Sequence, residues 1–259
     1  MSRSATILFW IPCFFFCIGA TFAHAEKKVM IVTLPKSGTH LMRKAVYLIT
    51  NEDYRWVSLD DTPYFRVGND LNRPHHITMA HIFPEMDVVR TQFSDCYTKV
   101  LLIRDPRDVM VSFTHHIAKG LIWSSCPDLD YHSFHEQSFD EQLKEILSFP
   151  DAYRGPSICF AYAALWMNSP DVLVCRFEDL VGAQGGGSDE KQFETLKALA
   201  QHIGYPRSDE DLRAIASQLF GGTWTFREGQ IGGWRSAFNA ENRHLFHLRF
   251  GQYVDCFGY

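Results

Sequence analysis

Lys36, Ser37 and Thr39 are the side chains best placed in the sequence to bind an anion. They surround Gly38, whose missing side chain lets the backbone approach a ligand closely. The apolar, β-branched run 29–33 precedes them and is typical of a buried parallel strand. From residue 39 onward, apolar residues recur at helical spacing. We therefore predict a strand, a tight loop and a helix N-terminus, where unpaired N–H groups and the helix dipole favour phosphate or a similar group.

This loop differs from a Walker A P-loop, which requires Gly-Lys followed by Ser or Thr. The dipeptide Gly-Lys does not occur in the chain, and Lys36 instead precedes Gly38 by two residues. The cradle is therefore shorter than a Walker A loop, and its lysine approaches from the other side. A strand–loop–helix of this kind with no ligand is the alternative interpretation of these residues alone.

Arg104 and Ser112 form a second group of candidate anion-binding residues. Arg104 ends the apolar run 99–104, and Asp105 is suited to cap the helix that follows. Ligands of open α/β sheets gather at the carboxyl ends of the strands. Two such sites suit a ligand with two separated anionic groups. An Arg–Asp ion-pair cluster at the start of a helix is the alternative.

A third signal is the glycine-rich segment 226–235, because an arginine in such a loop can fold over a bound anion. Segment 184–188 predicts a flexible surface linker. Segment 121–150 predicts one helix, 139–149, beside an aromatic pocket. The residues expected to line that pocket are Trp123, Tyr131, His132, Phe134 and His135. A lid that is only packed against the domain is the alternative.

The chain of 259 residues is long enough for a single α/β domain with a sizeable core. Its apolar runs alternate with helical patterns, which predicts a central parallel sheet flanked by helices. A net charge of −5 argues against nucleic acid as a partner. The spacing of the histidines and cysteines fits no metal site, so we expect no metal.

Residues 1–25 have the features of a secretory signal peptide. Arg3 gives a thin positive region, residues 5–23 are almost wholly apolar, and 23–25 (Ala-His-Ala) is a small-x-small cleavage site. The apolar run is also long enough to span a bilayer, so a retained signal anchor is the alternative. We expect a cleaved leader, a functional domain over 26–259 and a secreted or luminal protein. Membrane contact is expected only through an uncleaved leader.

Together these segments resemble the sulfotransferase family that uses 3′-phosphoadenosine-5′-phosphosulfate (PAPS). The family segments T-x-P-K-S-G-T-T/H, [I/V]-x-R-[N/D]-P-x-D-x-x-x-S and R-K-G-x-x-G-x-W-K have counterparts here in the same order. They lie at 34–40, 103–112 and 227–235. The resemblance implies a P-loop-like strand–loop–helix that binds the 5′-phosphosulfate. It also implies a 3′-phosphate site that includes Arg104 and Ser112, closed over by a loop that carries Arg227, Glu228 and Gly229.

The resemblance implies catalytic roles for Lys36 and His81. Lys36 and the N–H groups of residues 37–39 would hold the sulfonate, and His81 would take the proton of the acceptor. The sequence departs from the family at Met79, where cytosolic members usually have a lysine, and at Glu228, which replaces another lysine. A packed strand histidine is the alternative interpretation of His81.

The adenine site also departs from the family pattern. His40 and Leu41 stand where many cytosolic members have Thr-Trp, whose tryptophan stacks on adenine. Phe177 is therefore expected to offer an aromatic face in its place. The family's dimerisation motif is not preserved, so the resemblance carries no oligomeric state.

We therefore predict a PAPS-dependent sulfotransferase that moves a sulfonate group by in-line displacement. Its acceptor would be a hydroxyl or amine of a small molecule or carbohydrate, which the sequence does not identify. One alternative is a P-loop nucleotide kinase or phosphotransferase. Another is a protein that binds an adenosine bisphosphate without turnover, and the departures at Met79 and Glu228 favour it.

Overall fold

The computed structural model describes residues 28–52, 54–58, 77–81, 97–120, 131–149, 156–222 and 227–259. The predicted leader, residues 1–25, lies outside the described residues, as does Trp123 of the predicted acceptor pocket. Both expectations stay predictions. In the part of the chain that the structure describes, no helix is long and apolar enough to cross a membrane.

A parallel sheet forms the centre of the molecule. Its strands are β1 (Lys28–Thr33), β2 (Tyr54–Ser58), β3 (Ile77–His81), β4 (Tyr97–Ile103) and β5 (Val172–Arg176). They are ordered β2-β3-β1-β4-β5, and every pair of neighbours is parallel. In the central strand, Val32 lies beside Ala80 of β3 and Leu101 of β4. The predicted α/β fold with a central parallel sheet is confirmed.

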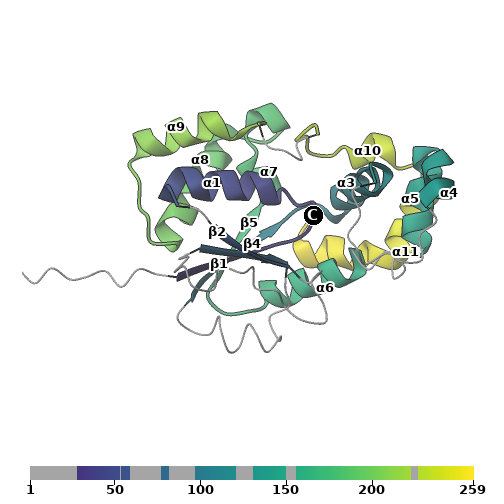
Figure 1. The fold of residues 1–259 in the computed structure, drawn as a ribbon, viewed down its shortest axis with the longest axis horizontal. Helices are drawn as coiled ribbons and strands as arrows, with labels where there is room; N and C mark the ends of the chain where they lie inside the picture. The colour runs from purple at the N-terminus through teal and green to yellow at the C-terminus, as the bar shows by residue number, and fades with distance from the viewer. Residues whose placement is uncertain are drawn as a thin grey trace, which may run out of the picture.

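Helices cover both faces of the sheet (Figure 1). One face carries α1 (Thr39–Thr50), α7 (Phe177–Leu180), α8 (Asp189–His202) and α9 (Asp209–Leu219). The other carries α3 (Pro106–Ala118), α4 (Tyr131–Glu136), α5 (Phe139–Ser148), α6 (Pro156–Met167) and α11 (Ala240–Phe257). The short helix α10 (Trp234–Ala237) lies against α3.

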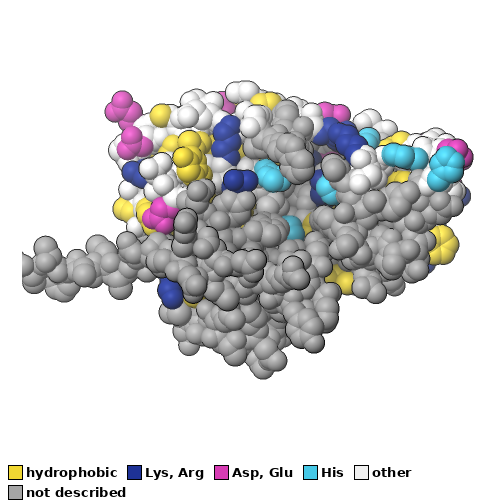
Figure 2. Space-filling view, in the orientation of Figure 1, with side chains coloured by type: hydrophobic (Ala, Val, Ile, Leu, Met, Phe, Trp, Pro, Cys, Tyr) yellow, Lys and Arg dark blue, Asp and Glu magenta, His cyan; other side chains and the backbone are white. Residues whose placement is uncertain are grey.

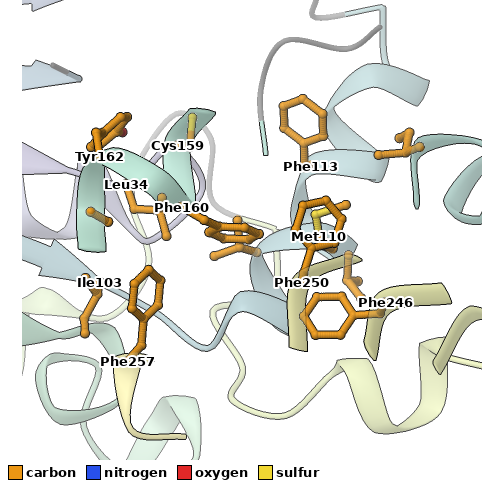
Figure 3. Close-up of a cluster of buried hydrophobic side chains, with 14 of the residues drawn as sticks. Leu34, Ile103, Met110, Phe113, Cys159, Phe160, Tyr162, Phe246, Phe250 and Phe257 are labelled. Atoms are coloured by element: carbon orange, nitrogen blue, oxygen red, sulfur yellow. The ribbon is translucent and has the colours of Figure 1, made fainter. Parts of the chain in front are cut away.

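The alternation of side chains along the strands divides the core in two. Met30 and Val32 pack on the α6–α11 side, whereas Val29 and Ile31 pack on the α1–α8 side. Every one of these side chains is buried, which explains why the strand is a continuous apolar run. Figure 3 shows the aromatic part of the first core, where α6 and α11 meet. Its rings include Phe160 and Phe250, whose centroids lie 5.5 Å apart at an interplanar angle of 77°.

Two expectations about the connecting segments were wrong. Segment 184–188 is not a flexible linker: residues Ala183–Gly185 form a 3₁₀ turn (η2), and Gly185 is buried. A Cβ on Gly185 would lie 2.4 Å from Val181 Cγ2, so glycine permits close packing there. Segment 121–150 contains α4 as well as the predicted helix α5.

The predicted acceptor-pocket residues on α4 do not share one environment. Phe134 is 1% exposed and belongs to the core, whereas His132 and His135 are exposed. Phe134 is therefore a packing residue, because its ring faces the domain interior. Phe134 is therefore removed from the predicted pocket lining, and the rest of that expectation stays a prediction.

We predict that Phe250→Ala lowers the free energy of unfolding by about 3–5 kcal/mol, because a buried ring is replaced by a cavity. Phe250 is 1% exposed and packs against the rings of Phe160 and Phe246. Leu248→Ala is the matched control, since Leu248 lies on the same helix and is 64% exposed. Urea unfolding followed by circular dichroism measures both. Equal losses in the two variants would contradict the assignment of this core.

Candidate active site

The candidate site lies at the carboxyl ends of the parallel strands. Lys36 follows β1, His81 ends β3, Arg104 follows β4 and Phe177 follows β5. In the sheet, β2 and β3 lie on one side of β1, and β4 and β5 lie on its other side. The strand order therefore reverses between β1 and β4. Ligands of open α/β sheets bind at such a switch point. The residues predicted from three distant segments of the sequence are thus brought to one edge.

The loop after β1 is held by its own serine. The Ser37 hydroxyl donates to the Leu34 carbonyl at 2.5 Å and lies 3.3 Å from the Leu102 carbonyl. The Ser37 N–H also donates to the Leu34 carbonyl, at 3.0 Å. We expected both donors to face an anion, but the structure directs them into the protein, where they tie the loop to itself and to β4. Ser37 is therefore a residue that shapes the cradle.

Gly38 directly precedes α1 as its N-cap residue and has a φ of 100°, in the left-handed region. A Cβ at this position would lie 2.6 Å from Cδ2 of Phe177, so any larger residue would displace that ring. Gly38 provides no side chain to cap the helix. The N–H groups of the first turn, which include those of Thr39 and His40, have no acceptor within the helix. They form a place for an anion at the positive end of α1.

Lys36 lies in this cradle with a φ of 66°, which is uncommon for a residue with a side chain. Burial, and then the positive charges of Arg104, Lys119 and Arg227, together lower the pKa of Lys36 to about 8. Figure 2 shows lysine, arginine and histidine side chains close together on this face of the molecule. A bound anion would relieve this repulsion and favour the ammonium form.

Arg104 connects the cradle to the glycine-rich loop. Its guanidinium donates to the Lys36 carbonyl at 3.4 Å and to the Gln230 carbonyl at 2.9 Å, and its side chain is only 12% exposed. Burial lowers the pKa of Arg104, while Asp108 and Glu178 oppose that effect. The buried Nε of Arg104 finds no hydrogen-bond partner among the described residues. A buried donor without a partner is costly, and a ligand oxygen would satisfy it.

Phe177 does not present the free aromatic face that we expected. The ring is 4% exposed, with the Arg104 guanidinium 4.2 Å above its centroid. Its edge packs against Gly38. Phe177 thus supports Arg104 by a cation–π contact and leaves no open ring surface for a base to stack on.

Asp108 positions the glycine-rich loop from α3. Its carboxylate accepts from the Gly232 N–H at 2.7 Å and from the Trp234 N–H at 2.9 Å, and it is 2% exposed. Ser112 is half-buried one turn farther along α3, four residues from Asp108, and so lies on the same side of the helix. Arg104 and Asp108 therefore both contact the loop, and Ser112 lies one turn beyond Asp108 on the same helix.

The other side of the loop rests on the η2 turn. The Ile231 N–H donates to the Gly185 carbonyl at 3.0 Å, and the Gln230 amide donates to the Gln184 carbonyl at 3.0 Å. A Cβ on Gly185 would also lie 2.6 Å from the Gly229 carbonyl oxygen. The glycines that resembled a linker in the sequence therefore form a platform for the loop.

Arg227 and Glu228 form an exposed ion pair at the start of the loop, with Nη1 2.8 Å from Oε1. Arg227 acts electrostatically on Lys36, Arg104 and His115, so its charge lies near the cradle. Glu228 was predicted among the donor-binding residues. Its carboxylate instead accepts from Arg227, where it would compete with an anionic ligand.

His81 is fixed by the backbone of β1. Its Nδ1 lies 2.5 Å from the Thr33 carbonyl oxygen, which can only accept, so Nδ1 carries the proton and Nε2 the lone pair. The pKa of His81 is lowered to about 4: burial is the main cause, His40 and Lys36 add to the shift, and the hydrogen bond to the Thr33 carbonyl opposes it. The imidazole is therefore neutral at pH 7, the form that can accept a proton.

Sequence reasoning missed several residues of this site. His116 lies on α3, four residues beyond Ser112, and Lys119 directly follows the helix. Both residues act electrostatically with Lys36. Burial, and then the charges of Lys36 and Lys119, together lower the pKa of His116 to about 4. Their spacing along the predicted helix from Ser112 was the available signal. Within the described segments, no group of three or more His, Cys, Asp or Glu side chains is placed to hold a metal.

A family model for the sulfotransferase domain matches residues 26–220. This chain belongs to the sulfotransferase family. The fold and the reaction class that the sequence predicted, sulfonate transfer, are thereby confirmed.

The sulfotransferase has relatives of low identity along most of its length. Sulfotransferase 6B1 of Danio rerio is 21% identical over 241 residues, 83% of this chain and 74% of that protein. Sulfotransferase 6B1 of Mus musculus is 20% identical, over 86% of this chain and 74% of that protein.

Two solved structures share the fold of the sulfotransferase. One is mouse sulfotransferase SULT7A1 complexed with PAP, with a TM-score of 0.64 and 20% identity over 88% of this chain and 84% of that one. The other is retinol dehydratase in complex with androsterone and the inactive cofactor PAP. Its TM-score is 0.58, with 17% identity over 88% of this chain and 81% of that chain.

We predict that Asp108→Asn in the sulfotransferase loosens the glycine-rich loop, because an amide can accept only one of the two N–H bonds. Hydrogen exchange measured by mass spectrometry should be faster in peptides that contain Gly232 and Trp234. Asp140→Asn is the control, since Asp140 is exposed on α5. Unchanged exchange around Gly232 would show that Asp108 does not hold the loop.

Proposed function

We propose that this sulfotransferase uses PAPS as donor and binds it across the ends of β1 and β4. The observation that carries the proposal is the convergence of Lys36, Arg104 and Arg227 on one edge of the sheet. Their mutual repulsion and the unpartnered Nε of Arg104 call for an anion with more than one charged group. Both structural neighbours named above contain PAP, which has two separated phosphates.

The two anionic ends of the donor would bind at different places. Lys36 and the first-turn N–H groups of α1 would hold the 5′-phosphosulfate end. Arg104 and Ser112 would bind the 3′-phosphate, with Arg227 closing over it. The family places these roles on the same motifs, and the site geometry supports them by bringing the motifs together.

When bound, PAPS supplies an activated sulfonate whose transfer leaves negative charge on the bridging oxygen. Lys36 would neutralise that charge as it develops, which is where a fixed cation contributes most to the rate. His81, with its lone pair on Nε2, would accept the proton of the attacking hydroxyl or amine. The half-buried setting of Lys36 strengthens this effect, because the charge is poorly screened by water.

The acceptor is proposed to be a small molecule or a carbohydrate. The half-buried His40, His115 and His116 lie around the cradle and offer polar contacts to an acceptor. The closest rival is an adenosine-bisphosphate-binding protein without turnover, because Glu228 competes for Arg227. Incubation with PAPS and a panel of phenols and glycans, followed by mass spectrometry, tests the proposal. A sulfated product supports it; binding of PAP without transfer to any panel member favours the rival.

The leader is part of the proposal only as a routing signal. Residues 5–23 are almost wholly apolar, and residues 23–25 are Ala-His-Ala, a small-x-small cleavage site. This pattern favours cleavage of the leader and a secreted or luminal enzyme. We predict that protein expressed with its native leader has a mature N-terminus at Glu26, as read by intact mass. Retention of Met1 in a membrane fraction would contradict this prediction and support the anchor.

We predict that Lys36→Ala lowers kcat by about 10²–10³-fold while PAP affinity changes much less, because the contact strengthens as the leaving oxygen gains charge. Single-turnover kinetics and calorimetric titration separate the two effects. Lys191→Ala is the control, since Lys191 is exposed on α8 and its ammonium group pairs with Glu194 of the same helix. An unchanged kcat in Lys36→Ala would remove Lys36 from the chemical step.

A further inference from the structure

The carbonyl oxygen of Thr33 accepts hydrogen bonds from two side chains. His81 Nδ1 lies 2.5 Å from it, and the Tyr162 hydroxyl lies 2.8 Å from it. Thr33 and Tyr162 are both 0% exposed. Tyr162 belongs to α6, and α6 and α1 cover opposite faces of the sheet. Figure 3 shows the Tyr162 ring within the buried cluster. A residue far from the cradle in sequence therefore touches the atom that fixes His81.

We propose that Tyr162 is a positioning residue: its hydroxyl holds the Thr33 carbonyl in place and limits how strongly that carbonyl accepts from His81. The inference rests on the proposed role of His81 as the base. Because a carbonyl oxygen can only accept, both contacts must be donations to Thr33. The Tyr162 O–H and the Nδ1–H of His81 thus donate to the same carbonyl oxygen, and each donation lowers the strength with which that oxygen accepts the other.

The choice of tyrosine over phenylalanine supports a role for the hydroxyl. The surrounding part of α6 is apolar, with Phe160 and Trp166 buried close by in sequence. A phenylalanine would fill nearly the same volume without placing a polar group in the core. The buried hydroxyl donates to Thr33, and this hydrogen bond links α6 to the end of β1.

Burial is the largest influence on the charge state of His81, and it opposes the imidazolium. His40 of α1 and Lys36 of the cradle also oppose the imidazolium electrostatically. The Thr33 carbonyl favours it, and Tyr162 sits on that same oxygen. Removing the Tyr162 hydroxyl should therefore strengthen the remaining bond and make His81 more basic.

The direct test is Tyr162→Phe, with Tyr205→Phe as control. Tyr205 donates to Glu52 and packs with the core on the α1–α8 side, so it does not touch Thr33. The pKa of His81 is measured by NMR titration of ring carbon-bound protons, with His81→Gln to assign the signal. We expect Tyr162→Phe to raise the pKa of His81 by about 0.5–1 pH unit and Tyr205→Phe to leave it unchanged. No change in Tyr162→Phe would overturn the inference.

The pH profile of kcat/KM separates this inference from the proposed function. If His81 is the base, the acidic limb should move upward by the same amount as the NMR value, with a lower plateau from looser positioning of the ring. An NMR shift without a matching shift of the profile would retain the role of Tyr162 and remove His81 as the base. A further measurement needs no variant: nitrogen NMR of the native protein should show His81 protonated on Nδ1 at pH 7. The opposite tautomer would overturn the inference even if Tyr162→Phe failed to fold.

Discussion

The gathering of positive charge at the ends of β1 and β4 is the constraint on which this site depends. Burial disfavours the charged forms of Lys36 and Arg104. The charges of Arg104 and Arg227 add to that cost for Lys36, and the charge of Arg227 adds to it for Arg104. Proteins keep such an arrangement where a ligand compensates for it. An anion with two separated charged groups would neutralise the cluster, whereas a single small anion would reach only part of it.

The rest of the fold supports these charges with neutral contacts. Ser37 closes the cradle, Gly38 lets Phe177 approach, and Phe177 in turn carries the Arg104 guanidinium. Asp108 and the η2 turn hold the glycine-rich loop from two sides. Segments separated by more than a hundred residues thus depend on one another, so a change in one loop should alter the geometry of the next.

The sequence predicted the sheet, most of the helices and the convergence of three motifs, because each of these follows from local patterns. The apolar runs of β1 and β4 specify buried strands, and Asp105 caps α3 as expected by accepting from the Arg107 N–H at 2.9 Å. Directions of side chains were less predictable. Ser37 was expected to face the ligand and Phe177 to offer its ring, but both are committed to contacts with residues distant in sequence.

The glycines of segment 184–188 show the same limit. Glycine-rich composition indicates flexibility when nothing packs against it and close approach when something does. Only the position of the Gly229 carbonyl and of Val181 decides between the two cases here. The role of Tyr162 was likewise hidden, since its contact with Thr33 spans 129 residues.

The central claim is that one edge of the sheet binds a nucleotide through two separate phosphate sites. Calorimetric titration with PAP, adenosine 5′-phosphate and adenosine 3′-phosphate tests it most directly. We predict that PAP binds roughly 10- to 100-fold more tightly than adenosine 5′-phosphate, because the second phosphate gains charge-assisted hydrogen bonds. Arg104→Ala should remove most of that difference and leave the affinity for adenosine 5′-phosphate nearly unchanged. Equal affinities of the native protein for PAP and adenosine 5′-phosphate would contradict the account.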